Sequence, residues 1–382
     1  LINTVCLNSM RKYFFVKKII KKYLVKKPGL NLELLLVSAI TQIIFLNFKA
    51  YAVINCSVEI AKIINLNPGL VNATLKNINK EKSNLINIKI SFNDLPEWFQ
   101  KKTGNLKIYD KTIFLDNFHN EPDIHIVFKD EKKMKQFEQA LIPSSFTSGF
   151  LQNREKIEYI KSFDLGNWWI QDFSSSYPLI RLNKKLKNKK IIDLCSAPGG
   201  KAFQILSKNL HIVLNDKSKN RLVFLKENLK RLNYEAKILN LDILNSNLKE
   251  KFDFIILDAP CSSLGTIRKN PEIFFKNESP HIDRLIKLQK KLLDKASSLT
   301  NNGGTIIYMV CSFLKEETVM QIDNFLENNK DFSLEKYAFE DKNSITKILI
   351  KNHCMYTLPT RIYDFNIDGY FASCLTKNSN LK

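Results

Sequence analysis

The chain has 382 residues, 44% hydrophobic and 25% charged, a balance that is typical of globular domains and excludes a disordered chain. Seven scattered cysteines, odd in number, exclude a disulfide scaffold and fit free thiols in a reducing compartment, so we expect a cytoplasmic protein. With 59 Lys and Arg against 38 Asp and Glu, the formal net charge of +21 favours a polyanionic partner, most often nucleic acid. The alternative is compositional drift, because Lys, Asn and Ile are over-used as in an AT-rich genome.

Residues 10–82 have a mostly helical pattern with an excess of Lys and Arg. The longest apolar run, Leu34 to Leu46, is shorter than the roughly 20 residues that span a bilayer, so it predicts a buried helix of a bundle and no membrane segment. The basic first 27 residues lack the apolar region and cleavage site of a secretory signal. An organelle transit peptide would favour Arg and Ser, and we give it little weight.

Residues 85–165 change in character. The β-like runs Leu85–Phe92 and Asp123–Phe128 alternate with a helical stretch near Glu131–Leu141. This alternation predicts a small α+β module between the helical domain and the rest of the chain.

From residue 166 to 382, predicted strands alternate with predicted helices, which favours an α/β fold with a doubly wound parallel sheet. The expected strands are Ile191–Leu194, His211–Leu214, Lys237–Leu239, Phe254–Leu257 and Thr305–Val310, and the expected helices are Gly200–Ser207, Ser218–Leu232 and Ile282–Leu299. The basic cluster Lys184–Lys190 precedes the first strand. It is interpreted first as a solvated loop and second as a phosphate contact.

A loop rich in small residues follows the first of these strands. Residues 193–201 read Asp-Leu-Cys-Ser-Ala-Pro-Gly-Gly-Lys and lead into a helix, so the backbone can approach a ligand closely. The spacing matches neither a Walker loop nor Gly-x-Gly-x-x-Gly. Four acids, Asp193, Asp216, Asp242 and Asp258, end or follow successive strands, where doubly wound sheets bind ligands. Each acid alone could be a helix N-cap, but four together indicate a binding crevice.

Two cysteines are expected at the same edge of the sheet. Cys261 follows the fourth strand and Cys311 the fifth, and each precedes a serine. A lone cysteine is usually a small buried hydrophobic residue, whereas two at this edge favour a thiolate nucleophile with an assisting thiol. No Cys-x-x-Cys or His spacing accompanies them, so no metal site is predicted.

These motifs resemble the Sun-type RNA (cytosine-5)-methyltransferases. The similarity rests on residues 193–201, on Asp-Ala-Pro-Cys-Ser at 258–262, on Cys-Ser at 311–312, on the entry motif at 166–175 and on Asp-Gly-Tyr-Phe at 368–371. Residues 51–75 resemble the NusB-like helical domain of the RsmB branch of this family, whose substrate is bacterial 16S rRNA. The resemblance therefore implies a class I methyltransferase domain at 166–382, a NusB-like RNA-binding domain at 1–84 and a small RNA-recognition module at 85–165.

The resemblance also implies a role for each matching position. The residues implied to bind S-adenosylmethionine are Cys195, Ser196, Ala197, Pro198, Gly199, Gly200, Lys201, Asp216 at the ribose, Asp242 near the adenine, and Asp258. Cys311 is implied to be the nucleophile and Cys261 to assist product release. Asp258 is expected to hydrogen-bond the ring nitrogen of cytosine, and Lys201 to favour the thiolate. No metal is expected, and a monomer is expected.

Two positions depart from the family pattern, and other functions remain open. Val310 stands where the family usually has Thr, and Thr318 where it usually has Asn, which puts the rate in question but not the role of Cys311. The alternatives are a tRNA cytosine methyltransferase of the same family and a catalytically idle rRNA-binding assembly protein. A DNA cytosine methyltransferase is disfavoured, because in those enzymes the nucleophile lies in the Pro-Cys motif and the cysteine of Val-Cys-Ser, here Cys311, has no counterpart. The expected substrate is a single-stranded or hairpin-loop cytosine, since the base must leave its stack.

Overall fold

The computed structural model describes residues 1–153, 157–160, 162–180, 182, 186–276, 281–335, 350–351 and 353–379. Within these residues the chain forms two compact units. The first contains Leu1–Glu121 with residues 268–276, and the second contains Pro122–Ile267 with the described part of 278–382. The compact units change at 121/122. The functional domain boundaries expected at 84/85 and 165/166 are a different kind of division, and they stay predictions.

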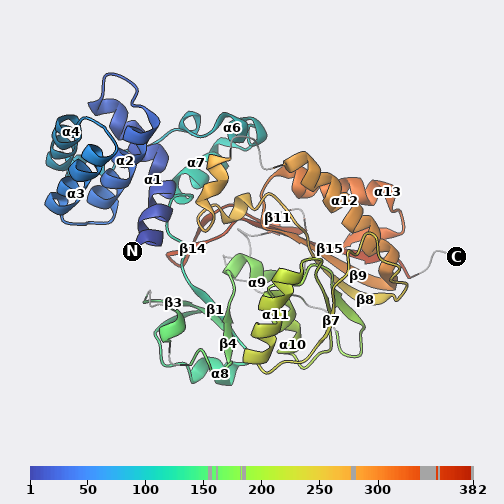
Figure 1. The fold of residues 1–382 in the computed structure, drawn as a ribbon. Coiled ribbons are helices and arrows are strands. Elements are labelled where there is room, and N and C mark those ends of the chain that lie inside the picture. Colours follow the sequence, from blue (N-terminus) through green and yellow to red (C-terminus); the bar gives the residue numbers. More distant parts are fainter. Residues whose placement is uncertain are drawn as a thin grey trace. The chain divides into compact units, whose positions relative to one another are not determined.

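The first unit consists of helices joined by turns and loops, with no strand among its described residues (Figure 1). Its α-helices are α1 (Ile2–Tyr23), α2 (Leu30–Ile40), α3 (Ala50–Ile63), α4 (Pro68–Lys80), α5 (Lys82–Leu85), α6 (Glu97–Lys102) and α7 (Ile108–Asn117). A π-helical turn, η1 (Thr41–Phe45), extends α2, and short 3₁₀ turns lie at η2 (Phe92–Asp94) and η5 (Pro271–Phe275). The predicted apolar helix of Leu34 to Leu46 is therefore confirmed as α2 with η1, and its side chains Leu36, Ile40, Ile43 and Ile44 are fully buried in the helical core.

One predicted strand in this unit is wrong. Leu85–Phe92 contains the end of α5, a turn and the start of η2, and none of it pairs in a sheet. The backbone N–H of Ser91 donates to Asp94 Oδ2 at 2.7 Å, so a capping box begins a 3₁₀ turn here. The alternating Ile86, Ile88 and Ile90 have the pattern of a strand. No strand among the described residues of this unit offers an edge with which they could pair.

The second unit contains two sheets of different construction. A four-stranded antiparallel sheet has the order β2-β3-β1-β4, and a larger sheet has the path β11-β12-β15-β9-β8-β5-β6-β7, with β10 pairing β15. The strands of the small sheet are β1 (His125–Phe128), β2 (Leu141–Ser145), β3 (Ser148–Leu151) and β4 (Trp168–Ile170), and α8 (Glu131–Lys135) and η3 (Ile157–Tyr159) lie between them in the chain. The predicted strand at 123–128 and the nearby helix are therefore confirmed with shorter bounds.

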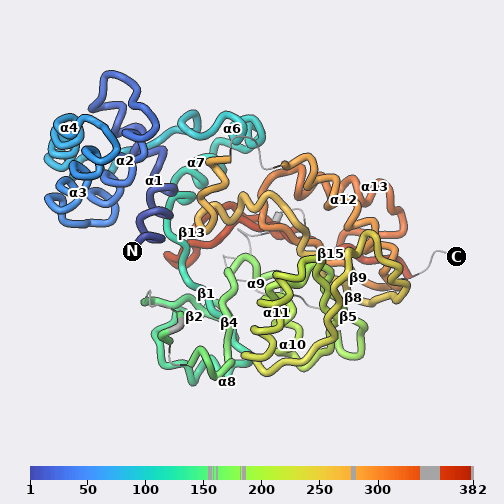
Figure 2. The backbone as a smooth tube through the Cα atoms, in the orientation of Figure 1, coloured from blue at the N-terminus to red at the C-terminus, as the bar shows by residue number. Residues whose placement is uncertain are grey.

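The larger sheet combines a parallel half with an antiparallel edge. Its parallel strands are β5 (Ile191–Asp193), β6 (Val213–Asn215), β7 (Lys237–Leu239), β8 (Phe252–Asp258) and β9 (Thr300–Val310). The antiparallel strands are β10 (Phe332–Glu335), β11 (Ile350–Lys351), β12 (Cys354–Thr357) and β15 (Tyr370–Lys377), and a small hairpin is formed by β13 (Thr360–Ile362) and β14 (Phe365–Ile367). Figure 2 lets the reader follow the chain through β5, β8 and β9 in the middle of the sheet. The predicted Rossmann-like doubly wound sheet is confirmed.

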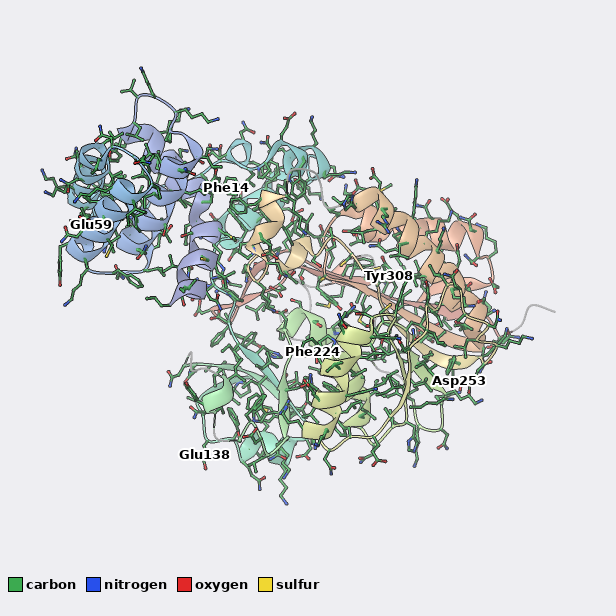
Figure 3. The ribbon with its side chains drawn as sticks, viewed as in Figure 1. Phe14, Glu59, Glu138, Phe224, Asp253 and Tyr308 are labelled. Carbon is green, nitrogen blue, oxygen red and sulfur yellow. The ribbon has the colours of Figure 1, made fainter. Side chains whose placement is uncertain are left out.

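Helices cover both faces of this sheet. Successive side chains of a strand point to opposite faces, and in these strands both sets are apolar, so each face needs a covering layer. The helices are α9 (Phe173–Ile180), α10 (Gly200–Leu206), α11 (Lys219–Arg231), α12 (Ile282–Leu299) and α13 (Val319–Asn328), with 3₁₀ turns η4 (Leu264–Thr266) and η6 (Lys315–Glu317). On β9, Ile307 and Met309 pack in one cluster with α9 to α11, whereas Ile306 and Tyr308 (labelled in Figure 3) pack in the other with α12 and α13.

Two absences concern the whole described part of the chain. No helix there is long and apolar enough to cross a bilayer. No group of three His, Cys, Asp or Glu in the same residues is arranged to hold a metal ion. Of the predicted basic cluster Lys184–Lys190, Lys184 and Lys185 lie outside the described residues.

Candidate active site

The four predicted acids lie along the carboxyl edge of the parallel strands. Asp193 and Asp258 are the last residues of β5 and β8, Asp216 directly follows β6, and Asp242 lies three residues after β7. The strands that carry them are neighbours in the order β8-β5-β6-β7, so the edge brings together side chains 65 positions apart in sequence. Parallel strands point the same way, which is why the four acids meet at one edge.

A crevice of about 490 Å³ opens at this edge. Of the residues predicted to bind the cofactor, Cys195, Asp216 and Asp242 line it directly. Apolar side chains form much of its wall, namely Leu194, Leu241, Ile243, Leu244, Leu288 and Leu292. Carboxylates beside an apolar wall suit a ligand that carries both hydroxyl groups and a flat base, so the residues present fit an adenosyl group.

Asp216 forms hydrogen bonds to two backbone segments beside the crevice. Its Oδ2 accepts a hydrogen bond from the backbone N–H of Ala197 at 3.1 Å, and its Oδ1 accepts one from the backbone N–H of Ser218 at 2.9 Å. The Arg221 guanidinium lies 3.5 Å from Oδ2 and also donates to the carbonyl oxygen of Ala197. Each carboxylate oxygen can accept a further bond, so Asp216 can position the loop and still receive a ligand hydroxyl.

The loop of residues 195–201 requires a glycine at position 199. Gly199 has φ +116°, and a Cβ there would lie 2.2 Å from the ring of Phe203. The loop leads into α10, which begins at Gly200. A Cβ added to Gly200 would lie 3.2 Å from the side chain of Gln171. The loop therefore folds tightly under the helix. Ser196, Ala197, Pro198, Gly199, Gly200, Lys201 and Asp258 are not among the residues that line the 490 Å³ crevice.

Lys201 and Asp258 form an ion pair between the cofactor loop and β8. Lys201 Nζ lies 2.6 Å from Asp258 Oδ2 and 3.1 Å from Ser175 Oγ. The other oxygen of Asp258, Oδ1, accepts a hydrogen bond from the Tyr370 hydroxyl at 3.0 Å, and the ammonium lies 5.4 Å from the centre of the Tyr370 ring. Because the Asp258 side chain is 32% exposed, this hydrogen-bonded pair can still present a polar group to a ligand.

Asp193 is the acid that the edge buries most deeply. It is 1% exposed, and burial, with a smaller contribution from the charge of Asp258, raises its pKa to about 7. Its Oδ1 accepts from the backbone N–H of Cys195 at 3.2 Å. It is thus a support for the loop and not a residue that lines the crevice.

The two predicted cysteines are in contact. Cys261 Sγ and Cys311 Sγ lie 3.3 Å apart, and both side chains are partly exposed. Their loops are held together by a close backbone approach, in which Gly265 N–H donates to the carbonyl of Cys311 at 3.0 Å and Gly369 N–H donates to that of Gly265 at 2.9 Å. A Cβ on Gly265 would lie 1.9 Å from the Gly369 carbonyl oxygen, so only glycine permits this contact.

The contact makes the two thiols chemically unequal. A hydrogen bond donated by Cys261 lowers the pKa of Cys311, and a weaker one involving Ser263 at 3.5 Å acts in the same direction. The same contact, together with burial, raises the pKa of Cys261. Lys201 also lowers the pKa of Cys311, but its charge contributes less than the neighbouring thiol, which sequence reasoning did not foresee. The pair therefore favours a thiolate on Cys311 and a proton on Cys261.

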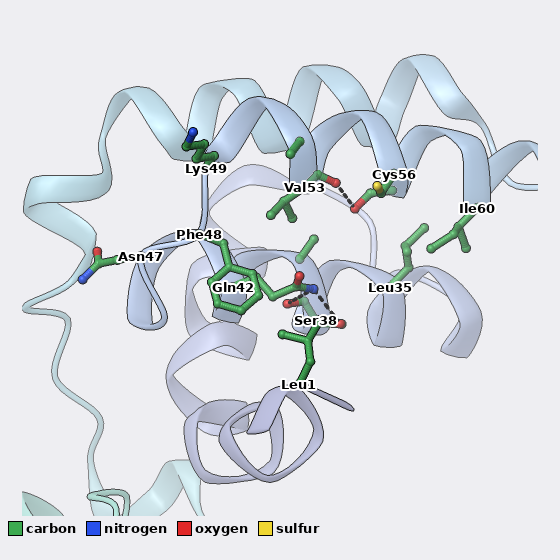
Figure 4. A pocket seen from close by; sticks show the side chains of 13 residues that line it. Leu1, Leu35, Ser38, Gln42, Asn47, Phe48, Lys49, Val53, Cys56 and Ile60 are labelled. Atoms are coloured by element: carbon green, nitrogen blue, oxygen red, sulfur yellow. Dashed lines mark hydrogen bonds between the residues drawn. The ribbon is translucent and has the colours of Figure 1, made fainter. Parts of the chain in front are cut away.

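A second pocket lies in the helical unit (Figure 4). It has a volume of about 580 Å³ between α2 and α3, and its lining includes Leu35, Gln42, Phe48 and Val53. Gln42 Nε2 donates to Ser38 within it. Its described lining contains no carboxylate, so it does not provide the acids expected for a ribose.

Several residues of the site carried no role in the sequence interpretation. Arg221 pairs with Asp216 and Asn215 donates to the carbonyl of Leu194, both in the lining of the crevice. Tyr370 donates to Asp258, and Glu317 accepts from the backbone of Ser262, the residue after Cys261. Tyr370 falls in the Asp-Gly-Tyr-Phe motif and Glu317 directly precedes Thr318, so the positions of both residues carried a signal without a chemical assignment. Asn215 carried none, because its amide bridges the ends of neighbouring strands only in the folded sheet.

Comparison with known proteins assigns the family. Residues 180–376 match the model described as 16S rRNA methyltransferase RsmB/F, and residues 1–80 match the NusB family. The chain belongs to the 16S rRNA methyltransferase RsmB/F family. The predicted RNA methyltransferase with an N-terminal NusB-like domain is thus confirmed at the level of the family.

Curated relatives are named ribosomal RNA small subunit methyltransferase B. The chain is 36% identical over 183 residues to the one from Photorhabdus laumondii, covering 47% of this chain and 42% of that protein. It is 27% identical over 358 residues to the one from Pasteurella multocida, covering 88% of this chain and 80% of that protein. The Photorhabdus match thus spans less than half the relative, whereas the Pasteurella match spans most of both chains.

Solved structures share the fold. "Crystal Structure of PH0851" matches with a TM-score of 0.73 at 21% identity, covering 98% of this chain and 89% of that chain. NSun6 from Pyrococcus horikoshii, crystallised with SFG, matches with a TM-score of 0.61 at 19% identity, covering 75% of this chain and 99% of that chain. At these identities the likeness supports the fold alone.

Proposed function

We propose that this chain transfers a methyl group from S-adenosylmethionine to carbon 5 of a cytosine in small-subunit (16S) rRNA, with Cys311 as the nucleophile. The observation that carries the proposal is the 3.3 Å contact between Cys311 and Cys261 at the edge of the sheet that also holds the acid-lined crevice. Carbon 5 of cytosine is a poor nucleophile by itself, so the reaction needs a group that adds to the ring first.

The cofactor is assigned to the crevice from its chemistry. Asp216 and Asp242 would accept hydrogen bonds from the ribose and the adenine side, and the apolar wall would cover the base. SFG, an analogue of S-adenosylmethionine, accompanies the fold neighbour NSun6, which supports a cofactor of this class. When bound, the cofactor supplies an electrophilic methyl on a sulfonium.

The thiolate of Cys311 attacks carbon 6, and the ring electrons move toward carbon 5. As the proton-bearing acid, Asp258 donates a hydrogen bond to the ring nitrogen where negative charge develops, and the ammonium of Lys201, 2.6 Å from Asp258, favours the thiolate of Cys311. Carbon 5 takes the methyl group, a base removes the carbon 5 proton, and the carbon 6–sulfur bond breaks to restore the thiolate. Cys261, which holds a proton beside the sulfur, assists this release.

The RNA is expected to approach the basic chain through its phosphates. The net charge of +21 favours such contacts, and the NusB-like domain favours rRNA over tRNA as the substrate. The tRNA enzyme and the catalytically idle assembly protein are the competing functions. Both remain outcomes of the experiment below.

The experiment uses the full chain with S-adenosylmethionine labelled in the methyl group. We expect labelled 5-methylcytidine in digests of 16S rRNA and none in tRNA, and no label with Cys311→Ala. Label in tRNA alone would assign the other substrate, and rRNA binding without label would assign the idle protein. Bisulfite sequencing of rRNA with and without the gene then gives the nucleotide.

A further inference from the structure

A single buried carboxylate joins the loops of the two cysteines. Glu317, at the end of η6, has no exposed surface. Its Oε1 accepts from the backbone N–H of Ser262 at 2.8 Å and from Gln289 Nε2 at 3.0 Å. Its Oε2 accepts from the hydroxyls of Ser262 and Ser312, both at 2.5 Å. Four donors on two oxygens satisfy a charge that would otherwise be costly to bury.

The donors come from the residues beside the two thiols. Ser262 follows Cys261 after β8, and Ser312 follows Cys311 after β9, so one carboxylate spans the two strand ends. The two hydroxyls also lie 3.2 Å from each other. The separation of the cysteines is therefore set by a shared acceptor, in addition to the sheet itself.

The carboxylate is in turn fixed by its surroundings. Gln289 of α12, which donates to it, also donates to the carbonyl of Pro260 at 3.0 Å and accepts from Gln321 of α13 at 3.3 Å. The hydroxyl of Tyr308 donates to the backbone carbonyl of Glu317 at 2.8 Å. A carboxylate held by these bonds has little freedom to move, so it can fix the positions of the residues that neighbour the two thiols.

The charge of Glu317 also acts on one thiol more than the other. It opposes ionisation of Cys261 and adds to the raised pKa of that thiol. The other charged and titratable groups that act on the pair are Asp258, which opposes ionisation of Cys311, and Lys201, which favours it, with Tyr308 and Tyr370 close to the same charges. Glu317 thus adds to a difference between the two cysteines whose first cause is the hydrogen bond between them.

We propose that Glu317 is a positioning residue of the methyl transfer: its carboxylate holds the two thiols in contact and keeps their shared proton on Cys261, leaving Cys311 as the attacking group. This inference rests on the proposed function for its meaning in catalysis. The clamp, by which we mean Glu317 with its hydrogen bonds to Ser262 and Ser312, is present in the protein without RNA. It is therefore tested in the free protein.

The test measures which cysteine reacts. The protein is alkylated with a limiting amount of iodoacetamide at neutral pH, and the modification of each cysteine is counted by mass spectrometry of its peptides. Thiolates react and thiols do not, so the wild type should be modified at Cys311 in preference to Cys261. Glu317→Gln keeps the volume but removes the charge and two acceptor sites. We expect the ratio of Cys311 to Cys261 modification to fall by about tenfold, which corresponds to about one unit in the difference of their pKa values.

The control is the neighbouring acid. Glu316→Gln removes the same charge one residue away from the clamp, and it should leave the ratio unchanged. Buried Cys354 and Cys374 report unfolding, since they should stay unmodified as long as the sheet is intact. A ratio unchanged in Glu317→Gln, with both reporters protected, overturns the proposal.

A second variant covers the case in which Glu317→Gln does not fold. Ser312→Ala removes one donor to the carboxylate and leaves the charge, and it should lower the ratio in the same direction by about threefold; an unchanged ratio there also overturns the proposal. Failure of the proposed function is a separate result, since it would appear as wild-type protein that forms no 5-methylcytidine whatever its alkylation ratio.

Discussion

The sharpest consequence of the thiol pair is that its two members fail differently when removed. Cys311 attacks carbon 6, so Cys311→Ala should form no covalent adduct with RNA and transfer no methyl group. Cys261 acts at release, so Cys261→Ala should form the adduct and retain it. Two structural cysteines would instead give two variants that are alike and merely less stable.

The contact geometry gives the size of the effect. Cys261→Ala also removes the hydrogen bond that Cys261 donates to Cys311 across 3.3 Å, the main cause of the lowered pKa of Cys311. Hydrogen bonds to charged groups contribute about 1.5–3 kcal/mol, and a thiol is a weak donor, so the lower end applies. Since about 1.4 kcal/mol equals one pKa unit, the thiolate and the rate of adduct formation should fall by about tenfold at neutral pH.

The assay follows radiolabelled 16S rRNA on denaturing gels over time, with S-adenosylmethionine present. Wild type should show at most a transient protein–RNA band, Cys261→Ala a band that appears slowly and persists, and Cys311→Ala none. Cys6→Ala, which removes an exposed cysteine of α1, is the matched control and should behave as wild type. If Cys311→Ala accumulates the adduct and Cys261→Ala does not, the nucleophile is Cys261 and the reasoning is refuted.

Three further outcomes are expected. Asp216→Ala should weaken cofactor binding by about 1.5–3 kcal/mol through loss of a charged acceptor, and calorimetry that finds equal affinity would contradict the assignment. Affinity for rRNA should fall steeply with salt, by about 0.7 log units per log unit for each phosphate contacted in a single strand, and a flat plot would mean that the net charge of +21 is compositional drift. The pKa of Asp193 is raised to about 7, above the unfolded value of about 4, so the folded chain binds more protons between these values and stability should fall as pH rises across that window. Asp193→Asn should flatten this part of a denaturation profile, and an unaltered slope would show that Asp193 does not titrate there.

The fold of the sheet could be predicted closely because it depends on local patterns. Lys237–Leu239 and Ile282–Leu299 have the bounds that period-two and period-3.6 spacing predict. Leu85–Phe92 could not, because alternating apolar residues form a strand only where a partner edge exists. The division of the chain near residue 121 was not foreseen for the same reason: it depends on contacts with residues 268–276, far away in sequence.

For the site, the sequence by itself determined which reacting groups exist and at which strand ends they lie, since Asp216 and Cys311 directly follow apolar strands, Asp258 ends one, and Cys261 comes three residues later. Only the tertiary structure decided how these groups act on one another. The proton order of the two cysteines comes from a 3.3 Å contact between adjacent strands and from the buried charge of Glu317, which touches both loops. Such effects depend on distance and burial, and a linear sequence specifies neither until the sheet has brought its strand ends together.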